Sequence, residues 1–432
     1  QLENKTMVKN NTFTNQYMAG LYLYYHDAPE ISGNTFISGS TYTSGISIYT
    51  AYCDNRLTIV KNRITRFYGG YGINTYYCDG AYGKEALIAD NMVSILGNNS
   101  SYGIYTAYGN YQKIFYNSVN IASEAGTSRG IYLLGSGVFH FIKNNIFAYT
   151  GNNSSGLAIY ISNTSGVTAM NYNNLYSTGT HLGYWNGLQA TLSSWQAAST
   201  KDSNSVSANP FFVSSTDLHT YAHGVDGKAT PLAEVTDDID NHVRHATIPD
   251  IGASEFDVPA HNIGILSFAA PVSSCGLTSP VQVTLNLKNF GTMQITAADV
   301  YYSMNNGPVI HEVMSHTILP DSVYAYTFVQ MADISAPGTY SFTAWVYMAG
   351  DTILLNDTIS NYTIYSGYDF NQGAFNMGFE LNEFTGDWST MDVNADNNGW
   401  TFYNSVSDAH TGTLSARLYN GNVNAGNDWL FS

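Results

Sequence analysis

The chain has 432 residues, of which 11% are charged and 14% are aromatic, with 35 tyrosines and 39 glycines. This length predicts more than one domain, and the low charge with abundant Tyr, Gly, Asn, Ser and Thr excludes an all-helical protein. The net charge of −17 is concentrated after residue 256, where 15 acidic residues stand against 2 basic ones. Nucleic acid is therefore not an expected partner, because its phosphates require basic contacts. No apolar run reaches the roughly 18 residues that predict a membrane span.

A repeat runs from residue 8 to about residue 176. In each copy an apolar residue is followed three positions later by Asn and then by another apolar residue. Glycine-led strands lie between the copies, as in Gly20-Leu21-Tyr22-Leu23-Tyr24 and Gly130-Ile131-Tyr132-Leu133, and keep the same period. Successive asparagines are 23 to 29 residues apart, and they are Asn11, Asn34, Asn62, Asn91, Asn117 and Asn145, with a weaker copy centred on Asn174.

A period of this length with alternation inside short strands is typical of a solenoid, whose units bury their inner faces only by stacking. Helical repeats would require 3.6-residue periodicity, and leucine-rich repeats a Leu and Asn framework that is absent. We therefore predict an all-β protein that begins with a right-handed parallel β-helix.

The repeated asparagines predict a structural ladder. Asn tolerates unusual backbone angles at a turn, and its amide can both donate to and accept from the Asn one turn away. Sugar binding by these residues is the less favoured alternative, because ladder side chains point inward. The ladder is expected to contain Asn34, Asn62, Asn91, Asn117 and Asn145.

Residues 4–185 resemble the parallel β-helix repeats of polysaccharide lyases, pectinases and many bacterial surface proteins. The strings that begin at Asn209, Asp238 and Asp250 resemble the closing segment of such helices in secreted bacterial proteins. The resemblance implies a first domain over residues 1–258, whose last part caps the open end of the helix. Arg244 is expected to pair with Asp250 or Glu255. A calcium site formed by Asp237, Asp238 and Asp240 is an alternative to a solvated turn there.

Two further modules are predicted. Residues 259–366 contain alternating strands separated by turns such as Asn305-Asn306-Gly307-Pro308 and fit an immunoglobulin-like β-sandwich. Residues 367–432 contain Gly378-Phe379-Glu380, Asn398-Gly399-Trp400 and Asn427-Asp428-Trp429, in the order seen in jelly-roll modules of the cleaved-adhesin type, common in Bacteroidota. The resemblance implies the first part of a jelly roll.

Calcium is the cofactor considered for the third module. In Asp392-Val393-Asn394-Ala395-Asp396, oxygen ligands alternate and suit a calcium loop, although the glycine spacing departs from an EF-hand. The expected ligands are Asp392, Asn394 and Asp396, with help from Glu380 or Asp428. An Asx-rich turn is the alternative.

Several polar residues of the β-helix are candidate catalytic groups. A lyase needs a base and a cation beside a uronate, and a glycosidase needs two carboxyls about 5–10 Å apart. The candidates are His26, Asp27, Asp54, Asp79, Lys84, Glu85, Arg129, His140 and Lys143. No matched pair among them demands catalysis, so no catalytic residue is assigned.

The tyrosines suggest a binding face. Aromatic residues in successive strands can form ladders along one side of the helix, and aromatic faces bind sugar rings. The predicted carbohydrate-binding residues are Tyr22, Tyr24, Tyr49, Tyr76 and Tyr105, with plain ladder packing as the alternative.

The sequence thus predicts a secreted or cell-surface protein with an adhesive or structural role that faces an extracellular glycan. A polysaccharide lyase or glycoside hydrolase is the alternative. Both ends interrupt a pattern, so the chain is expected to be a fragment. Cys53 and Cys78, one repeat apart, are expected to be stacked thiols or a disulfide, which leaves Cys275 alone.

Overall fold

The computed structural model describes residues 3–4, 6–39, 41–275, 280–336 and 338–367, together with four short strands beyond residue 388. The chain divides into two compact units, Gln1–Val258 and Pro259–Ser432. Each is described separately. Within the described residues, no helix is long and apolar enough to cross a membrane.

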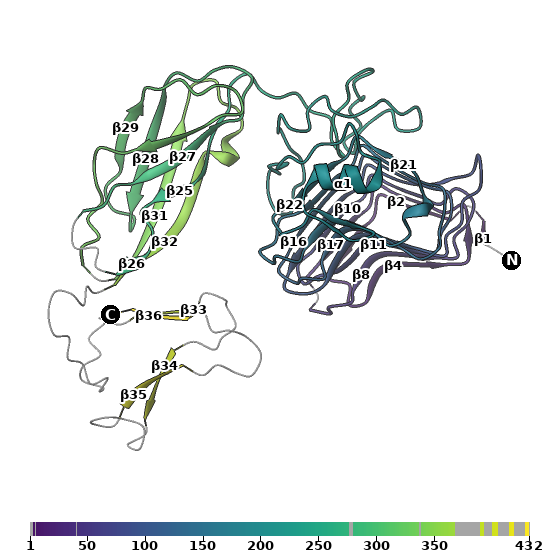
Figure 1. Ribbon diagram of the computed structural model, residues 1–432, viewed down its shortest axis with the longest axis horizontal. Coiled ribbons are helices and arrows are strands. Elements are labelled where there is room, and N and C mark those ends of the chain that lie inside the picture. The colour runs from purple at the N-terminus through teal and green to yellow at the C-terminus, as the bar shows by residue number, and fades with distance from the viewer. Residues whose placement is uncertain are drawn as a thin grey trace. The chain divides into compact units, whose positions relative to one another are not determined.

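The first unit is a parallel β-helix built from three sheets, and each turn contributes one strand to each sheet (Figure 1). Sheet 1 contains β2 (Met7–Lys9), β6 (Glu30–Ser32), β9 (Thr58–Val60), β12 (Ala86–Ala89), β15 (Gln112–Phe115), β18 (His140–Lys143) and β21 (Val167–Asn171). Sheet 2 contains β3 (Thr12–Thr14), β7 (Thr35–Ser38), β10 (Arg63–Arg66), β13 (Met92–Gly97), β16 (Ser118–Ser123), β19 (Ile146–Tyr149) and β22 (Asn174–Ser177).

Sheet 3 is the longest of the three. It contains β4 (Ala19–Tyr24), β8 (Ile46–Ala51), β11 (Gly70–Tyr76), β14 (Ser101–Ala107), β17 (Arg129–Leu134), β20 (Leu157–Ile161), β23 (Gly183–Trp185) and the antiparallel β24 (Leu188–Gln189). A separate two-stranded parallel sheet is formed by β1 (Glu3–Asn4) and β5 (His26–Asp27). Sheet 3 contributes one column of aliphatic side chains to the interior, since Ile48, Ile73, Ile104, Ile131 and Ile159 follow one another in register and are fully buried. Inward residues of sheets 1 and 2 belong to the same buried cluster.

The asparagines form a continuous hydrogen-bonded ladder at the turn between sheets 1 and 2. Asn62 Nδ2 donates to Asn91 Oδ1 at 2.9 Å, and Asn91 Nδ2 donates to Asn117 Oδ1 at 2.9 Å. Equivalent bonds join Asn11, Asn34, Asn62, Asn117, Asn145 and Asn173. The last member is therefore Asn173, and the copy centred on Asn174 was placed one residue too late, because Asn174 pairs with Ile146 as the first residue of a strand.

The unusual backbone angle also lies one residue before the position expected. The residue that precedes each ladder Asn has a positive φ, as in Lys61 (57°), Asp90 (52°) and Tyr116 (51°). The ladder Asn itself supplies the side-chain amide that forms hydrogen bonds with the backbone and the Asn of the neighbouring turns. The left-handed residue points its side chain outward, where it is available for other contacts.

The open end of the β-helix is closed by α1 (Leu192–Ser199) and not by the segment that follows it. Thr191 caps α1, and Trp195 is fully buried against the last turn, where its Nε1 donates to Asp202 at 2.8 Å. Asp202 also accepts from Asn173, so it ends the ladder. A short 3-10 turn, η1 (Thr164–Gly166), precedes β21.

Residues 209–256 were expected to cap the helix, but they pack along its side. Their apolar residues Val225, Val235 and Ile251 share a buried cluster with Tyr116 and Ile146 of the helix turns. The prediction was wrong because this segment packs on apolar residues of the outer surface of the β-helix. The last turn is already covered by α1.

The second unit contains two sheets that share one core. One sheet has β25 (Ile263–Ala270), β27 (Thr284–Asn289) and β30 (Val323–Thr327). The other has β26 (Ser274–Cys275), β28 (Ala298–Met304), β29 (Ile310–Met314), β31 (Gly338–Tyr347) and β32 (Thr358–Gly367), with η2 (Leu354–Asn356) between the last two. Leu285 and Leu287 of the first sheet join Val300, Ala344 and Val346 of the second in one buried cluster. An immunoglobulin-like topology stays a prediction for residues 259–366.

Beyond residue 388, the described elements are two strand pairs. They are β33 (Ser389–Asp392) with β36 (Asp428–Phe431), and β34 (Trp400–Asn404) with β35 (Leu414–Leu418). The jelly-roll assignment of residues 367–432 falls mostly outside the described residues and stays a prediction.

Candidate functional site

The outer surface of sheet 3 carries the predicted tyrosines, and we call it the tyrosine face. Tyr22 and Tyr49 are direct register neighbours, and Tyr105 lies two strands beyond Tyr49 in the same column. Tyr24 and Tyr76 belong to the adjacent column, where Ala51 lies between them in register. The first column continues through Tyr132, Tyr160 and Tyr184. All five predicted residues therefore share one face.

A further row of tyrosines follows the edge of this face. Tyr25, Tyr52, Tyr77 and Tyr108 each have a positive φ at the turn after their strand and stack at centroid distances of 5.0, 5.4 and 4.8 Å. The row ends at Gly135, where an added Cβ would lie 2.4 Å from the Tyr108 ring.

Rings on the face have two orientations. Tyr22 stacks on Tyr49 at 4.6 Å, and Tyr71 stacks on Tyr102 at 4.9 Å. Tyr105 is turned by 88° to Tyr71, and Tyr76 is turned by 89° to Tyr77. The surface thus offers ring edges, ring faces and hydroxyls together. Tyr22 is 60% exposed and Tyr24 is 41% exposed, so the face is open at its first turns.

The first column is interrupted at one strand. Asn74 stands between Tyr49 and Tyr105 in register, and it is 8% exposed. Its Oδ1 is buried without a hydrogen-bond partner. An unpaired buried amide oxygen costs stability, so packing alone does not explain this residue.

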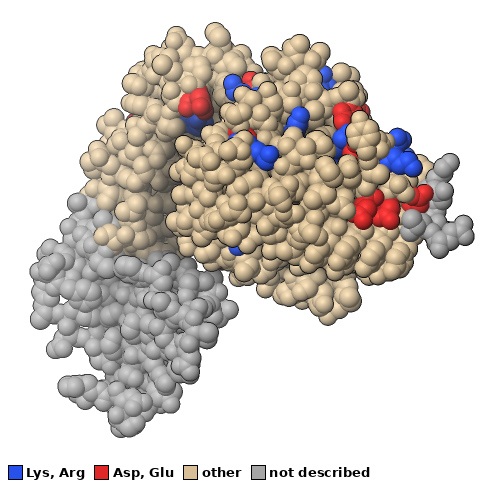
Figure 2. Space-filling view, turned by 45° about the vertical axis from the view of Figure 1, so that its right-hand side comes forward, with Lys and Arg blue, Asp and Glu red and all other residues tan. Residues whose placement is uncertain are grey.

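The tyrosine face is almost free of charge. The strands of sheet 3 contain one charged residue, Arg129, and no carboxylate. Arg129 donates to the carbonyls of Gly126 and Ser128 and lies 5.6 Å from the centroid of Tyr160, so it is a structural clamp. A hydrogen bond with Tyr25, followed by burial, raises the pKa of Tyr24 to about 12. Its phenol therefore stays neutral, and a neutral aromatic surface suits an uncharged ligand. Figure 2 shows a broad part of the visible β-helix surface without charged side chains.

Asp54 and Asp79, which were weighed as catalytic groups, form part of a second polar ladder. Asp54 Oδ1 accepts from the backbone N of Asp79 at 3.0 Å, and Asp79 Oδ1 accepts from Asn110 Nδ2 at 2.8 Å. Asn110 Oδ1 then accepts from the backbone N of Val138 at 3.0 Å. These side chains hold the turn that follows sheet 3. The sequence did not predict this ladder, because the spacing of Asp54, Asp79 and Asn110 is irregular.

The remaining catalytic candidates do not converge. His26 Nδ1 lies 2.7 Å from Thr6 Oγ1, and Asp27 accepts from Asn55. Glu85 lies 3.7 Å from Lys113. His140 faces the helix interior, where burial lowers its pKa to about 4. Each of these groups serves the local structure.

The most deeply buried ion pair among the described residues of the first unit joins Arg244 to Asp90. Arg244 donates to Asp90 at 2.6 Å, lies 3.3 Å from Glu255 and sits 3.8 Å from the centroid of Tyr116. The Glu255 pairing had been predicted, whereas Asp90 is 154 residues away in sequence. The side chains of Arg244 and Asp90 are 3% and 4% exposed, so this pair fastens residues 209–256 to the helix.

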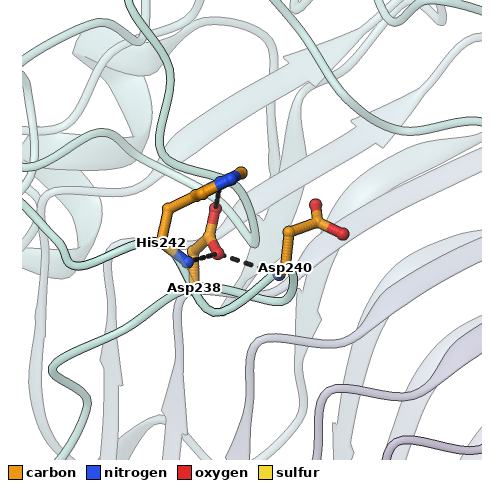
Figure 3. Close-up of side chains that lie close together, drawn as sticks. All are labelled: Asp238, Asp240 and His242. Atoms are coloured by element: carbon orange, nitrogen blue, oxygen red, sulfur yellow. Dashed lines mark hydrogen bonds and ion pairs between the residues drawn. The ribbon is translucent and has the colours of Figure 1, made fainter.

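The acidic turn of that segment brings together Asp238, Asp240 and His242, as shown in Figure 3. Asp238 is fully buried, and its oxygens accept from the backbone N of Asp240, His242 and Glu255 at 2.8 to 2.9 Å. Asp240 bonds to Arg63 and His219. Because N–H donors already occupy these oxygens, the geometry is that of an ordered turn, and it carries no calcium assignment. Asp237, the remaining residue of the predicted calcium site, forms an ion pair with Lys61 at 2.6 Å.

The other predicted calcium site lies outside the described residues. Asn394 and Asp396 are not described, and Asp392 is described only as the last residue of β33. Calcium binding by Asp392, Asn394 and Asp396 stays a prediction.

Comparison with protein families gives a match in the first part of the chain. Residues 1–94 are similar to the family described as periplasmic copper-binding protein (NosD). Neither the curated proteins nor the solved structures gave a match. The similarity covers less than a quarter of the chain and lies within the β-helix.

The two cysteines of this segment do not fit a copper centre. Copper favours thiolate, thioether and imidazole ligands. Cys53 and Cys78 are free, fully buried and stacked, with the backbone N of Cys53 donating to Cys78 Sγ at 3.4 Å. Burial raises the pKa of the Cys78 thiol, which opposes the thiolate form that metals require. Among the described residues, the one group of three metal-binding side chains is the Asp238 turn, outside the matched segment.

Proposed function

We propose that this chain belongs to a non-catalytic, glycan-binding protein of the cell envelope, with an adhesive or structural role, and that the tyrosine face is its binding surface. The observation that carries the proposal is the combination of adjoining tyrosine columns with an absence of carboxylates across the described strands of sheet 3. Aromatic rings stack on the apolar faces of sugars, and phenol hydroxyls meet their polar edges.

The charge pattern separates this proposal from catalysis. A lyase or a glycosidase needs acid and base groups beside the bound sugar. The one charged side chain of sheet 3, Arg129, is held by backbone carbonyls. None of the other candidate acids and bases lies in a strand of sheet 3. Binding without chemistry is therefore favoured over a polysaccharide lyase or hydrolase.

The location is supported by the family similarity. The family that resembles residues 1–94 is periplasmic by its description. Proteins built on parallel β-helices serve unrelated functions, so fold alone chooses none of them. The location outside the cytoplasm and the glycan partner are both parts of the proposal.

The test is a binding assay on the full chain with a panel of soluble polysaccharides, by affinity electrophoresis and then calorimetry. Tyr22→Ala/Tyr24→Ala should weaken binding at least tenfold, because these rings are exposed and open to ligand. The matched control is Tyr82→Ala, which removes a 91% exposed tyrosine from a turn outside the face.

The same panel is monitored for unsaturated uronates and reducing ends. Product formation would favour the enzyme. Wild-type protein that binds no polysaccharide, or equal binding by the double variant, would refute the proposal.

A further inference from the structure

The column of the tyrosine face that contains Tyr24 and Tyr76 alternates between large and small side chains. In register along four strands it contains Tyr24, Ala51, Tyr76 and Ala107. Residues in register on neighbouring parallel strands share one face of the sheet. Ala51 and Ala107 are nevertheless 0% and 1% exposed, so neighbouring side chains cover them. The column therefore repeats every two turns, whereas the β-helix repeats every turn.

The ring of Tyr24 contacts rings of two successive turns. Its centroid lies 4.3 Å from that of Tyr25 in its own turn and 5.3 Å from that of Tyr52 in the next turn, with interplanar angles of 83° and 73°. The ring thus leans toward the turn that contains Ala51, whose small side chain leaves room for it. Tyr24 is 41% exposed, so a ligand can reach this ring.

The ring of Tyr76 repeats this arrangement two turns later. Its centroid lies 4.7 Å from that of Tyr77 and 5.7 Å from that of Tyr108, with interplanar angles of 89° and 86°. Ala107 follows Tyr76 in register, as an alanine also follows the first ring. Tyr76 is partly exposed and Tyr77 is 37% exposed, so this second copy is also open to a ligand.

The two copies define a spacing along the β-helix axis. Neighbouring strands lie about 4.8 Å apart, so copies two turns apart are separated by about 9.6 Å. The edge row of Tyr25, Tyr52, Tyr77 and Tyr108 supplies one stacked ring per turn. A ligand that follows the axis therefore meets an edge-row ring at every turn and an additional ring at every second turn.

We propose that the tyrosine face binds a linear, uncharged, β-1,4-linked polysaccharide that lies parallel to the β-helix axis, with one disaccharide to every two turns. This inference rests on the proposed function and names its ligand class. In an extended β-1,4-linked chain each sugar advances by nearly the distance between two turns. Successive sugars are inverted, so alternate sugars present the same face to the protein.

Other linkages and charged chains fit this surface less well. α-1,4-linked and β-1,3-linked glucose chains curve into helices, so their sugars do not stay in step with the turns. The described strands of sheet 3 carry no carboxylate, and their one cation, Arg129, is held by backbone carbonyls. An uncharged chain therefore meets no unpaired charge on this face.

The test measures binding of oligosaccharides of increasing length to the full chain by calorimetry. The probes are β-1,4-linked oligomers of glucose, mannose and N-acetylglucosamine with two, four and six units, and α-1,4- and β-1,3-linked glucose oligomers of the same lengths. The edge row spans four turns. The tetramer of at least one β-1,4-linked series should therefore bind at least tenfold more tightly than its dimer, and the hexamer should add less than about threefold. The α-1,4- and β-1,3-linked tetramers should bind at least tenfold more weakly.

The variant Tyr76→Ala removes the second copy and keeps the first. It should lower the affinity for the β-1,4-linked tetramer about tenfold, toward that of the dimer, and change the affinity for the dimer by no more than about twofold. Tyr184→Ala is the matched control, because Tyr184 lies on the same face beyond the edge row and should affect neither. Unfolding midpoints of both variants establish that the fold is kept.

Three results would overturn this inference and leave the proposed function standing. They are equal binding of dimer and tetramer, binding of α-1,4- or β-1,3-linked oligomers at least as tight as that of the β-1,4-linked ones, and equal effects of Tyr76→Ala and Tyr184→Ala. Binding of another polysaccharide that is lost in Tyr22→Ala/Tyr24→Ala, without binding of any β-1,4-linked oligomer, would likewise overturn the inference alone. A wild-type chain that binds no polysaccharide would overturn both.

Discussion

Replacement of Asn91 by Leu removes one step of the ladder at its centre. Asn91 Nδ2 donates to Ile59 O at 2.8 Å and to Asn117 Oδ1 at 2.9 Å, and its Oδ1 accepts from the backbone N and Nδ2 of Asn62 at 3.0 and 2.9 Å. Asn62 Nδ2 keeps two other acceptors, Ile31 O and Val60 O. The backbone N–H of Asn62 loses its acceptor in a fully buried turn.

The expected loss follows from these contacts. A buried donor without a partner costs about 1–3 kcal/mol, and each of the three other bonds contributes about 0.5–1.5 kcal/mol. We expect Asn91→Leu to lower the free energy of unfolding by about 3 kcal/mol or more. The measurement is urea unfolding of the full chain followed by far-ultraviolet circular dichroism.

The control makes the same substitution at the end of the ladder. Asn11 is exposed and donates to Lys9 O and Asn34 Oδ1, while Asn34 Oδ1 keeps the backbone N of Asn11. Asn11→Leu should therefore cost less than about 1 kcal/mol. An unchanged midpoint for Asn91→Leu, or equal losses for both variants, would refute the ladder as a source of stability.

Three further predictions concern buried polar groups. The pKa of His140 is about 4 in the folded protein and about 6.5 in the unfolded chain, so the unfolded chain binds more protons between these values and the wild type should lose up to about 3 kcal/mol from pH 6.5 to 4. His140→Phe should remove that part of the pH dependence, and an unchanged urea profile against pH would contradict it. Arg244→Met should cost about 3–5 kcal/mol because Asp90 is left buried and unpaired, and the double variant with Asp90→Leu should recover much of the loss. Asn74→Tyr removes an unpaired amide and completes the aromatic column, so its urea midpoint should rise, and a lower midpoint would show that the column cannot accommodate another ring.

The sequence was sufficient for features that repeat with the period of the helix. The spacing of Asn62, Asn91 and Asn117 was enough to place them on successive turns, because each turn adds the same short strands and the interior selects the same register. The shared face of the tyrosines follows from the same register. The immunoglobulin-like topology and the calcium ligands have no such internal check and stay predictions.

Features formed between distant segments could not be read in this way. The sequence alone does not reveal the buried pair of Asp90 with Arg244, because a carboxylate at a turn is usually solvated and the two residues are 154 positions apart. Residues 216–219 lie beside β10, and no repeat relates these two segments. The role of α1 was missed because its eight residues show little beyond a capping Thr191 and one Trp. Local patterns establish a period, but they do not select which remote segment covers which surface.

The division of surfaces on the β-helix supports a ligand-binding role for sheet 3. The side-packed segment contacts the outward residues before the ladder asparagines, through Lys61, Asp90, Tyr116 and Asn144. It covers parts of sheets 1 and 2 and the turn between them, where charged and apolar side chains face outward. Packing between neighbouring rings explains why the tyrosines stack. It does not explain why Tyr22, at the first turns, is exposed. Large exposed aromatic patches are rare on soluble proteins unless they bind something. Within the described residues of the first unit, the side-packed segment contacts sheets 1 and 2 and leaves Tyr22 and Tyr24 exposed, an arrangement that supports the proposal of a ligand for this face.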